Sequence, residues 1–365
     1  MKQGFRRKII NLVSSSQIVE NLSRQKCMSS CLVALLMSRS VQLSELSHYL
    51  NDEVKRSSNE TRLQDFFRET EFDYSRVGIL LLSLLKRKVK LTLTIDRTEW
   101  DFGKCQVNIL MVIVSDGQIH VPLYWEMLDN KSGNSNSGQR KDLLKKCITL
   151  VGKERIGLLL ADREFVGHEW LSYLKAQGIR FCIRIPEHHL ITDDQGNQHR
   201  ASELLIQGKE RLLKEVMVDG VWGNAYLKST KKGNLFFVFG TAQVEYLGQL
   251  YSKRWKIETL FQAFKSRGFN LKKTHLKNFE RLSKMVALVS IAFAFCISVG
   301  KFLHEKVKTI PLKKHQYKAK SFFRHGLDFI REILTAKKKR SKEYKKLIKL
   351  IFRWLSICYS TLKPS

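Results

Sequence analysis

The segment "KVKLTLTID", residues 88–96, decides the fold class, because its side chains change polarity at every second position. The apolar positions are Val89, Leu91, Leu93 and Ile95, and they alternate with Lys90, Thr92, Thr94 and Asp96. Successive side chains of a strand point to opposite faces of a sheet, so this period of two predicts a half-buried β-strand. The predicted strand ends in a carboxylate, that of Asp96.

The segments that follow predict two more strands, a helix and a fourth strand. Two apolar, β-branched runs flank Asp116-Gly117, which is a strong signal for a hairpin. A polar loop is expected over 129–142, and "LLKKCITLVGK" (143–153) predicts a helix. "RIGLLLADREF" (155–165) is a short apolar run typical of a buried strand, and it places Asp162 at the strand's end.

This order of elements predicts an RNase H-like α/β core, a mixed sheet with flanking helices. The fold places one carboxylate on its first strand and another at the end of its fourth, the positions of Asp96 and Asp162. In-line attack on a phosphodiester builds charge on both the entering and the leaving oxygen, and two magnesium ions about 3.5–4 Å apart stabilise both. Magnesium prefers oxygen ligands, so a third carboxylate is needed.

The segment "YSKRWKIETLFQAFK", residues 251–265, offers that third carboxylate on a predicted helix. At about 100° per residue, Tyr251, Arg254, Glu258 and Lys265 share a face about 60° wide. The adjoining face is apolar and is expected to pack on the sheet; it carries Ile257, Leu260, Phe261 and Phe264. A solvated helix with an i,i+4 Arg–Glu pair is the alternative interpretation.

The spacing Tyr-x2-Arg-x3-Glu-x6-Lys in this segment resembles a known family signature. It is similar to that of the Asp-Asp-Glu (DDE) transposases of bacterial cut-and-paste insertion sequences, in the group named for its Tyr-Arg-Glu-Lys (YREK) motif. "TIDRTEW" around Asp96 and "LLADREFVG" around Asp162 resemble the first and second acidic motifs of that family. The resemblance covers roughly residues 85 to 300. The 96 residues from Asp162 to Glu258 (258 − 162) leave room for the β-rich insertion that the family carries.

The resemblance implies a chemistry, a cofactor and partners. It implies that Asp96, Asp162 and Glu258 are catalytic and hold two Mg²⁺ ions, or Mn²⁺, in each active site. It implies double-stranded DNA as partner, both the terminal inverted repeats and the target, bound by a homodimer on paired ends. The residues expected to contact DNA are Tyr251, Arg254, Lys265 and, in the insertion, Trp222, an aromatic that would hold a flipped base. A core position is the alternative for Trp222.

Four regions are expected along the chain. They are a helical N-terminal DNA-binding region (1–84), an RNase H-like catalytic domain (85–180 and 246–303), a β-rich insertion (181–245) and a basic helical C-terminal region (304–365). A helix-turn-helix unit and an ordinary helical hairpin remain equal alternatives for the N-terminal region.

The composition favours a nucleic-acid partner. The 365-residue chain has a formal net charge of +31, which favours a polyanion because neutralised phosphates release counterions. Its seven cysteines have no zinc-type partners, so reduced thiols in a cytoplasmic, nucleoid-associated bacterial protein are expected. No signal peptide is predicted. The apolar run 285–300 is shorter than a membrane span and predicts a buried core helix, so no membrane partner is expected.

These residues are consistent with three functions. The first is a metal-dependent transposase that cuts terminal repeats and transfers strands into target DNA. The second is an RNase H-like structure-specific DNA nuclease. The third is a catalytically inactive, DNA-binding transposase relative, which the presence of all three carboxylates disfavours.

Overall fold

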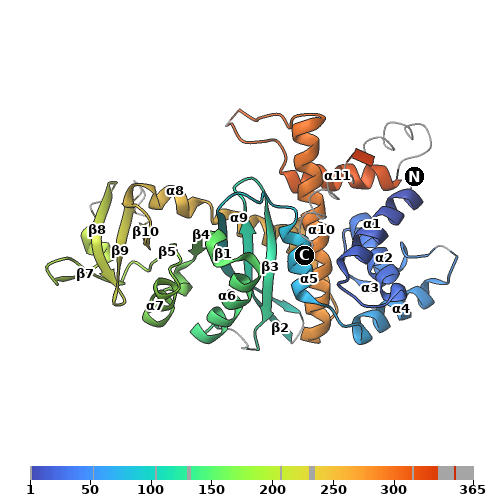
Figure 1. Cartoon of the computed structure of the whole chain (residues 1–365), viewed down its shortest axis with the longest axis horizontal. Coiled ribbons are helices and arrows are strands. Elements are labelled where there is room, and N and C mark those ends of the chain that lie inside the picture. Colours follow the sequence, from blue (N-terminus) through green and yellow to red (C-terminus); the bar gives the residue numbers. More distant parts are fainter. Residues whose placement is uncertain are drawn as a thin grey trace.

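The computed structural model describes residues 2–51, 53–102, 105–129, 133–205, 208–229, 235–314, 316–335 and 349–350. The molecule is elongated, with N-terminal helices at one end, a long sheet through the middle, and the last strands of that sheet at the other end (Figure 1). The basic segment 337–354, expected as a C-terminal helix, lies almost wholly outside the described residues.

One continuous mixed sheet organises the chain. Its strand order is β3-β2-β1-β4-β5-β10-β9-β8-β6-β7. The strands are β1 (Leu91–Phe102), β2 (Cys105–Ser115), β3 (His120–Met127), β4 (Ile156–Ala161), β5 (Phe181–Arg184), β6 (Leu190–Thr192), β7 (Gln198–Arg200), β8 (Glu210–Val218), β9 (Val221–Ser229) and β10 (Leu235–Gly240). β1, β4 and β5 pair in parallel, whereas β2 and β3 are antiparallel. The order 3-2-1-4-5 with this polarity is the RNase H-like arrangement, so the predicted fold class is confirmed.

The first strand is longer than predicted, and Asp96 lies in its middle rather than at its end. The parallel pairing of β1 with β4 stops at Ile95, but the antiparallel pairing with β2 continues to Phe102 opposite Cys105. Asp96 therefore marks the point where one of the two neighbouring strands ends. The hairpin at Asp116-Gly117 is confirmed, with Gly117 in the left-handed region at φ 94°.

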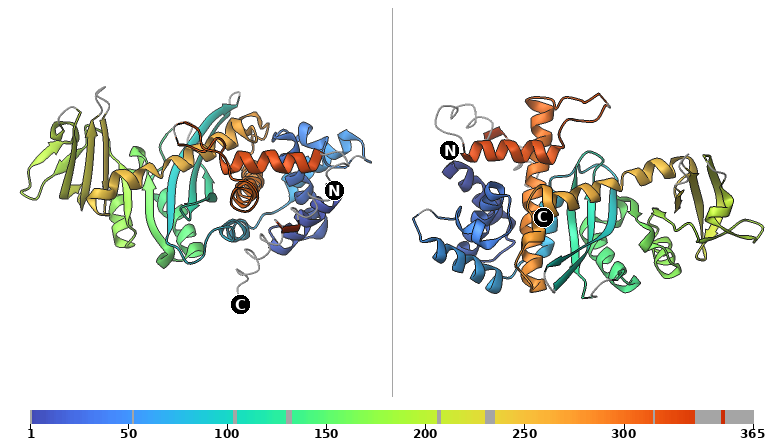
Figure 2. Two further views of the ribbon diagram at one scale, coloured as in Figure 1. Left: turned by 90° about the horizontal axis from the view of Figure 1, so that it is seen from above. Right: turned by 180° about the vertical axis from the view of Figure 1, so that it is seen from behind.

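Helices cover both faces of the core sheet. α6 (Ser137–Val151) and α7 (His168–Ala176) lie on one face, and α9 (Trp255–Gln262) packs on β1 from the other (Figure 2). α6 begins inside the predicted 129–142 loop, because the side chain of Asn136 accepts from the N–H of Gln139 and Gln139 bonds back in a capping box.

The predicted insertion extends the core sheet rather than forming a separate sheet. β5 was expected to open the insertion at 181, but it pairs in parallel with β4 and completes the core. β10 then pairs antiparallel with β5, and β9, β8, β6 and β7 follow outward. The short strands β6 and β7 were not predicted from the sequence.

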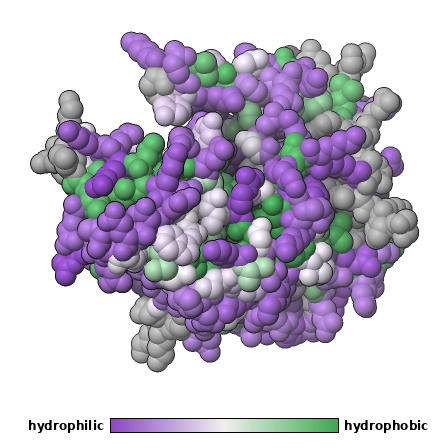
Figure 3. Space-filling model, turned by 60° about the vertical axis from the view of Figure 1, so that its left-hand side comes forward, coloured by the Kyte–Doolittle hydropathy of each residue, from purple (hydrophilic) through white to green (hydrophobic). Residues whose placement is uncertain are grey.

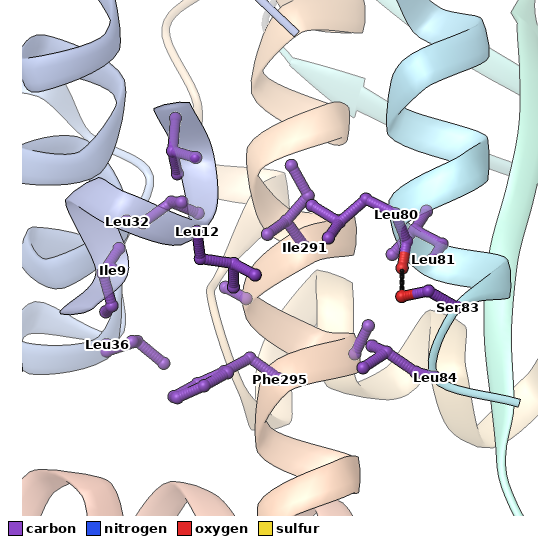
Figure 4. Close-up of a pocket in the computed structure, with 13 residues that line it drawn as sticks. Ile9, Leu12, Leu32, Leu36, Leu80, Leu81, Ser83, Leu84, Ile291 and Phe295 are labelled. Carbon is purple, nitrogen blue, oxygen red and sulfur yellow. Dashed lines mark hydrogen bonds between the residues drawn. The ribbon is translucent and has the colours of Figure 1, made fainter. Parts of the chain in front are cut away.

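A long apolar helix, α10 (Phe279–Lys306), joins the sheet to the N-terminal helices. Those helices are α1 (Lys2–Ser16), α2 (Leu22–Ser38), α3 (Leu43–Ser47), α4 (Arg56–Glu69) and α5 (Tyr74–Leu82). Figure 4 shows apolar side chains of α1, α2 and α5 meeting Ile291 and Phe295 of α10 around a gap of about 30 Å³. Among the described residues, α10 alone has the length and composition of a membrane span, but its apolar window is entirely buried, as expected for a core helix. At 28 residues it is longer than the predicted run.

The last described helix, α11 (Phe322–Thr335), crosses α10 at a point where both backbones lack side chains. A Cβ on Gly300 would lie 1.8 Å from the carbonyl oxygen of Phe322, and a Cβ on Gly326 would lie 1.9 Å from that of Cys296. Only glycine allows two helix backbones to approach this closely.

Candidate active site

Asp96 and Asp162 are brought side by side by two neighbouring strands. β1 and β4 run parallel, and their register ends at the pair Ile95 and Ala161. Asp96 and Asp162 each follow that pair by one residue, so both lie where the parallel pairing of β1 with β4 ends. In each case Oδ1 accepts a hydrogen bond of 2.8 Å from the backbone N–H of the next residue. The backbone itself therefore orients both carboxylates.

The segment 251–265 is not the single regular helix that its periodicity predicts. α8 (Leu247–Ser252) ends before Lys253, α9 begins at Trp255, and 263–267 is a π-helix. Between α8 and α9 the chain tightens: the N–H of Arg254 bonds the carbonyl of Tyr251 at 2.9 Å, a three-residue spacing. Departures of this kind often lie at functional sites. The predicted apolar face is confirmed, because its four side chains are all buried: Ile257, Leu260, Phe261 and Phe264.

Arg254 joins two of the three predicted acidic residues. Its Nη1 donates to Oδ2 of Asp96 at 2.7 Å, and its Nη2 pairs with Oε1 of Glu258. The side chain of Arg254 is only 11% exposed. Burial disfavours its charge, but Tyr251 and the carboxylates of Asp96, Asp162 and Glu258 outweigh burial and raise its pKa. One buried guanidinium thus serves as the common counter-ion of all three carboxylates.

Tyr251 reaches the remaining acid. Its hydroxyl donates to Oδ1 of Asp162 at 3.2 Å, and its ring lies buried against Phe236, with centroids 5.3 Å apart. Burial raises the pKa of the phenol. Tyr251 and Arg254 were predicted as DNA contacts, and in the structure both contact the acidic residues.

Asp96 has an electrostatic environment suited to a cation. Burial, together with the weaker influence of the charges of Asp162 and Glu164, raises its pKa to about 7, although the charge of Arg254 and the hydrogen bond from the N–H of Arg97 act in the opposite direction. Near neutral pH, the carboxylate is therefore poised between its protonated and ionised forms, and a strong nearby cation would favour ionisation.

A basic groove adjoins the acids. Lys265, in the π-helix, donates to the carbonyl of Glu99 at 2.9 Å and lies over the ring of Trp100. Burial, followed by the neighbouring charge of Lys272, lowers the pKa of Lys265 to about 8. Both lysines line a hollow of about 450 Å³ that is also lined by Asp96 and Glu258. This basic groove is also termed the catalytic hollow or catalytic groove. Sequence reasoning missed Lys272, which lies beyond the motif and carries no pattern of its own.

A network of polar side chains lies next to Asp96 and Asp162 and is centred on Arg97 and Glu164. Arg97 pairs with Glu164 at 3.2 Å and with Glu99, and its Nη1 donates to Asn108 at 3.2 Å. The side chain of Glu164 is only 17% exposed. Arg140 donates to the Glu164 carbonyl at 3.0 Å and fixes the backbone next to Asp162.

The carboxylate oxygens of Asp96, Asp162 and Glu258 are the kind of ligand that a hard divalent cation prefers. In this structure, the guanidinium of Arg254 lies between Asp96 and Glu258. Among the described residues, no three Asp, Glu, His or Cys side chains are close enough to hold an ion together. Two buried atoms of the site, Oε1 of Glu164 and Nε of Arg254, have no hydrogen-bond partner within the part of the chain that the structure describes. Oxygen donors and unsatisfied polar atoms together fit a site that takes a further polar group.

Trp222 lies on the face of the sheet that leads to the site. In β9 it is on the same side as Tyr226, whose ring contacts Phe236, and Phe236 in turn contacts Tyr251. Trp222 is 45% exposed, so the alternative core position is wrong.

The surface drawn in Figure 3 is mainly hydrophilic, with apolar residues in small groups.

The chain matches one family model over most of its sheet and part of α10. The model of the transposase DDE domain matches residues 92–295, more than half of the chain and the whole span from β1 to the middle of α10. No curated protein is significantly similar in sequence.

Three solved structures are partly similar to this chain. A chain of the piggyBac transposase synaptic complex with hairpin DNA is 10% identical, with a TM-score of 0.44 over 99% of this chain and 83% of its own. Endonuclease V from Bacillus subtilis is 11% identical, with a TM-score of 0.28 over 57% of this chain and 95% of its own. Argonaute from Marinitoga piezophila, in complex with guide RNA and target DNA, is 11% identical, with a TM-score of 0.22 over 56% of this chain and 31% of its own.

Proposed function

The chain belongs to the family of transposases with a DDE domain, and from this premise we propose that it cuts DNA at the terminal inverted repeats of a bacterial insertion sequence and joins the ends to target DNA. The YREK spacing of Tyr251, Arg254, Glu258 and Lys265 supports the insertion-sequence group. The observation that carries the proposal is the buried guanidinium of Arg254, which Asp96 and Glu258 share although 158 and 4 residues separate them from it.

Asp96, Asp162 and Glu258 are the residues that would hold two Mg²⁺ ions, or Mn²⁺. When bound, such ions stabilise charge on the attacking and leaving oxygens of an in-line displacement. Arg254 neutralises the acids before binding and keeps Asp96 and Glu258 in place. Tyr251 orients Asp162 through its hydroxyl. Lys265 and Lys272 present cations along the groove in which a DNA strand would lie.

The rest of the chain has roles that follow from this proposal. The catalytic domain is formed by the expected segments 85–180 and 246–303 together with β5, the insertion begins after β5, and the N-terminal helices are the DNA-end-binding region. Trp222 holds a base flipped out near the cut. The active species is a homodimer on paired ends, acting in the cytoplasm at the nucleoid.

A nicking assay on a labelled terminal repeat tests the catalytic assignment. Asp96→Asn, Asp162→Asn and Glu258→Gln are each expected to abolish magnesium-dependent cutting while DNA binding in EDTA stays largely intact. Asp142→Asn, on the exposed surface of α6, is the matched control and is expected to cut normally. Full-rate cutting by any of the three variants would show that the site is misassigned.

Strand joining separates the proposal from its alternatives. A structure-specific nuclease would cut branched DNA and leave ends that are never joined to a target. A catalytically inactive relative would bind ends and cut nothing in either metal. The proposal requires cut ends with a free 3′ hydroxyl that become covalently joined to target DNA.

A further inference from the structure

A second hollow lies on the far side of α9 from the acids. It has a volume of about 430 Å³ and lies between the β2–β3 hairpin, α9, the middle of α10 and the segment leading into α11. Lys256 and Thr259 line it from α9, whereas Glu258 lines the catalytic hollow. Positions 256 and 258 are about 200° apart around a helix, so the two hollows open on opposite faces.

Three lysines line this hollow, and two of them form no ion pair with any acidic side chain that the structure describes. Lys256 donates to the hydroxyl of Ser115 and to the carbonyl of Gly117, both at 2.9 Å. An ammonium has three N–H groups, so one of them is left for a further acceptor. Lys318 lies over the ring of Phe322 at 4.4 Å. Within the described residues, neither Lys256 nor Lys318 forms an ion pair, whereas Lys320 pairs with Asp328 at 2.9 Å.

Two neutral features of the same hollow also favour an anion. Nε2 of His120 is buried and has no hydrogen-bond partner among the described groups. The first residues of α11, Phe322 and Phe323, form part of the wall, so the N-terminal end of a 14-residue helix borders the hollow. Unpaired N–H groups and the helix dipole make such an end favourable for negative charge.

We infer that this hollow binds a phosphodiester group of DNA, at a site separate from the catalytic groove. The inference rests on the proposed function, which places DNA on the molecule. Two ammonium groups that form no ion pair within the described residues and the N-terminus of α11 offer N–H donors to an oxyanion, and Nε2 of His120 adds another when it carries the proton. The apolar side chains of Phe293 and Ile297 line the same hollow. None of these donors is selective for a base, so the contact fixes the backbone of the DNA without reading its sequence.

The salt dependence of DNA binding tests the site. Lys318→Gln removes one exposed cation of the hollow, and Lys175→Gln, at an exposed position of α7, is the matched control. Binding is measured in EDTA from 50 to 300 mM NaCl, on a terminal repeat and on an unrelated duplex. For Lys318→Gln we expect affinity to fall about threefold to tenfold on both duplexes, and the slope of log K against log salt to become shallower by about 1. Lys175→Gln should match the wild type.

The remaining outcomes decide against the site in distinguishable ways. If the wild type binds DNA and Lys318→Gln has the control's affinity and slope, the site is wrong while the proposed function stands. If the wild type binds no DNA, both fail. Calorimetric titration with inorganic phosphate distinguishes the source of the anion: weak binding that competes with DNA supports the inference. Tight phosphate binding that Lys318→Gln abolishes, with DNA binding unchanged, would assign the hollow to a free phosphate compound instead.

Discussion

Nη1 of Arg254 donates a hydrogen bond to Oδ2 of Asp96 at 2.7 Å, across 158 residues of sequence. The same guanidinium bonds Glu258 through its other terminal nitrogen, so a planar fork spans two carboxylates that come from different elements. Arginine suits this position because its donors are fixed in one plane, whereas lysine is a point charge on a flexible stem.

Replacing Arg254 with lysine is expected to break this bridge while keeping the charge. A single ammonium cannot reproduce the fork, so Asp96 or Glu258 loses its partner. We expect the free energy of unfolding to fall by about 1–3 kcal/mol and cutting to fall by more than about tenfold. Chemical denaturation and the nicking assay measure the two effects. A variant with wild-type stability and activity would mean that the bridge contributes nothing.

Tyr251→Phe tests whether Tyr251 acts through Asp162. The ring stays in place against Phe236, and only the hydroxyl at 3.2 Å from Asp162 is removed. A lost second-layer hydrogen bond to a metal-binding group typically costs about tenfold to 100-fold in metal affinity or activity. We expect the magnesium concentration required for half-maximal cutting to rise, with DNA affinity in EDTA unchanged.

Tyr124→Phe is the matched control for this experiment. Its hydroxyl also makes one hydrogen bond, to Ser75 at 3.2 Å, but it lies away from the acids. Its metal requirement should be that of the wild type. If Tyr251→Phe instead weakens DNA binding in EDTA with no change in metal requirement, Tyr251 is a DNA contact as the sequence predicted.

Periodicity and spacing predicted the core sheet and brought Asp96, Asp162 and Glu258 into consideration. They did so because strand alternation and helix faces are local properties of the chain. The angular count along 251–265 failed where the chain is irregular: it tightens at Arg254 and widens into the π-helix that carries Lys265. Such departures are set by tertiary contacts, which no local pattern records.

The sequence also did not predict which other residues lie around the three acids. Glu164, in the turn that follows β4, is largely shielded from solvent where Arg97 of β1 pairs with it. Lys272 joined the groove because the turn after the π-helix returns it to the catalytic hollow. Both contacts depend on the sheet register and on the path of the chain between elements, which are outcomes of the whole fold.

The crossing of α10 and α11 provides a stability test away from the site. A Cβ at Gly326 would clash with backbone atoms that cannot move alone, at 1.9 Å from the Cys296 carbonyl oxygen. We expect Gly326→Ala to lower the free energy of unfolding by at least about 1–3 kcal/mol, as overpacking does. Thermal and chemical denaturation measure this loss.

Gly138→Ala in α6 is the control for that loss. Its nearest atom is the Asn136 side-chain oxygen at 3.2 Å, and alanine favours the helical state more than glycine does. It should be neutral or slightly stabilising. A Gly326→Ala protein as stable as this control would show that the two helices separate without cost.

His120 makes stability depend on acidity. Burial, together with the charge of Lys256, lowers its pKa from 6.5 to about 3, and the charge of Asp116 acts in the opposite direction. Lys318 and Lys320 line the same hollow. The unfolded chain therefore binds more protons than the folded protein between these two values. Stability from this group is complete above about pH 6.5 and is lost as the pH falls toward about 3, by about 1.4 kcal/mol per pH unit.

His120→Gln removes the titrating group, so we expect the wild type to lose stability more steeply than the variant between pH 6.5 and 4 in parallel denaturation series. Carboxylates titrate equally in both proteins, and equal slopes would show that the imidazole reaches solvent and is protonated in the folded state.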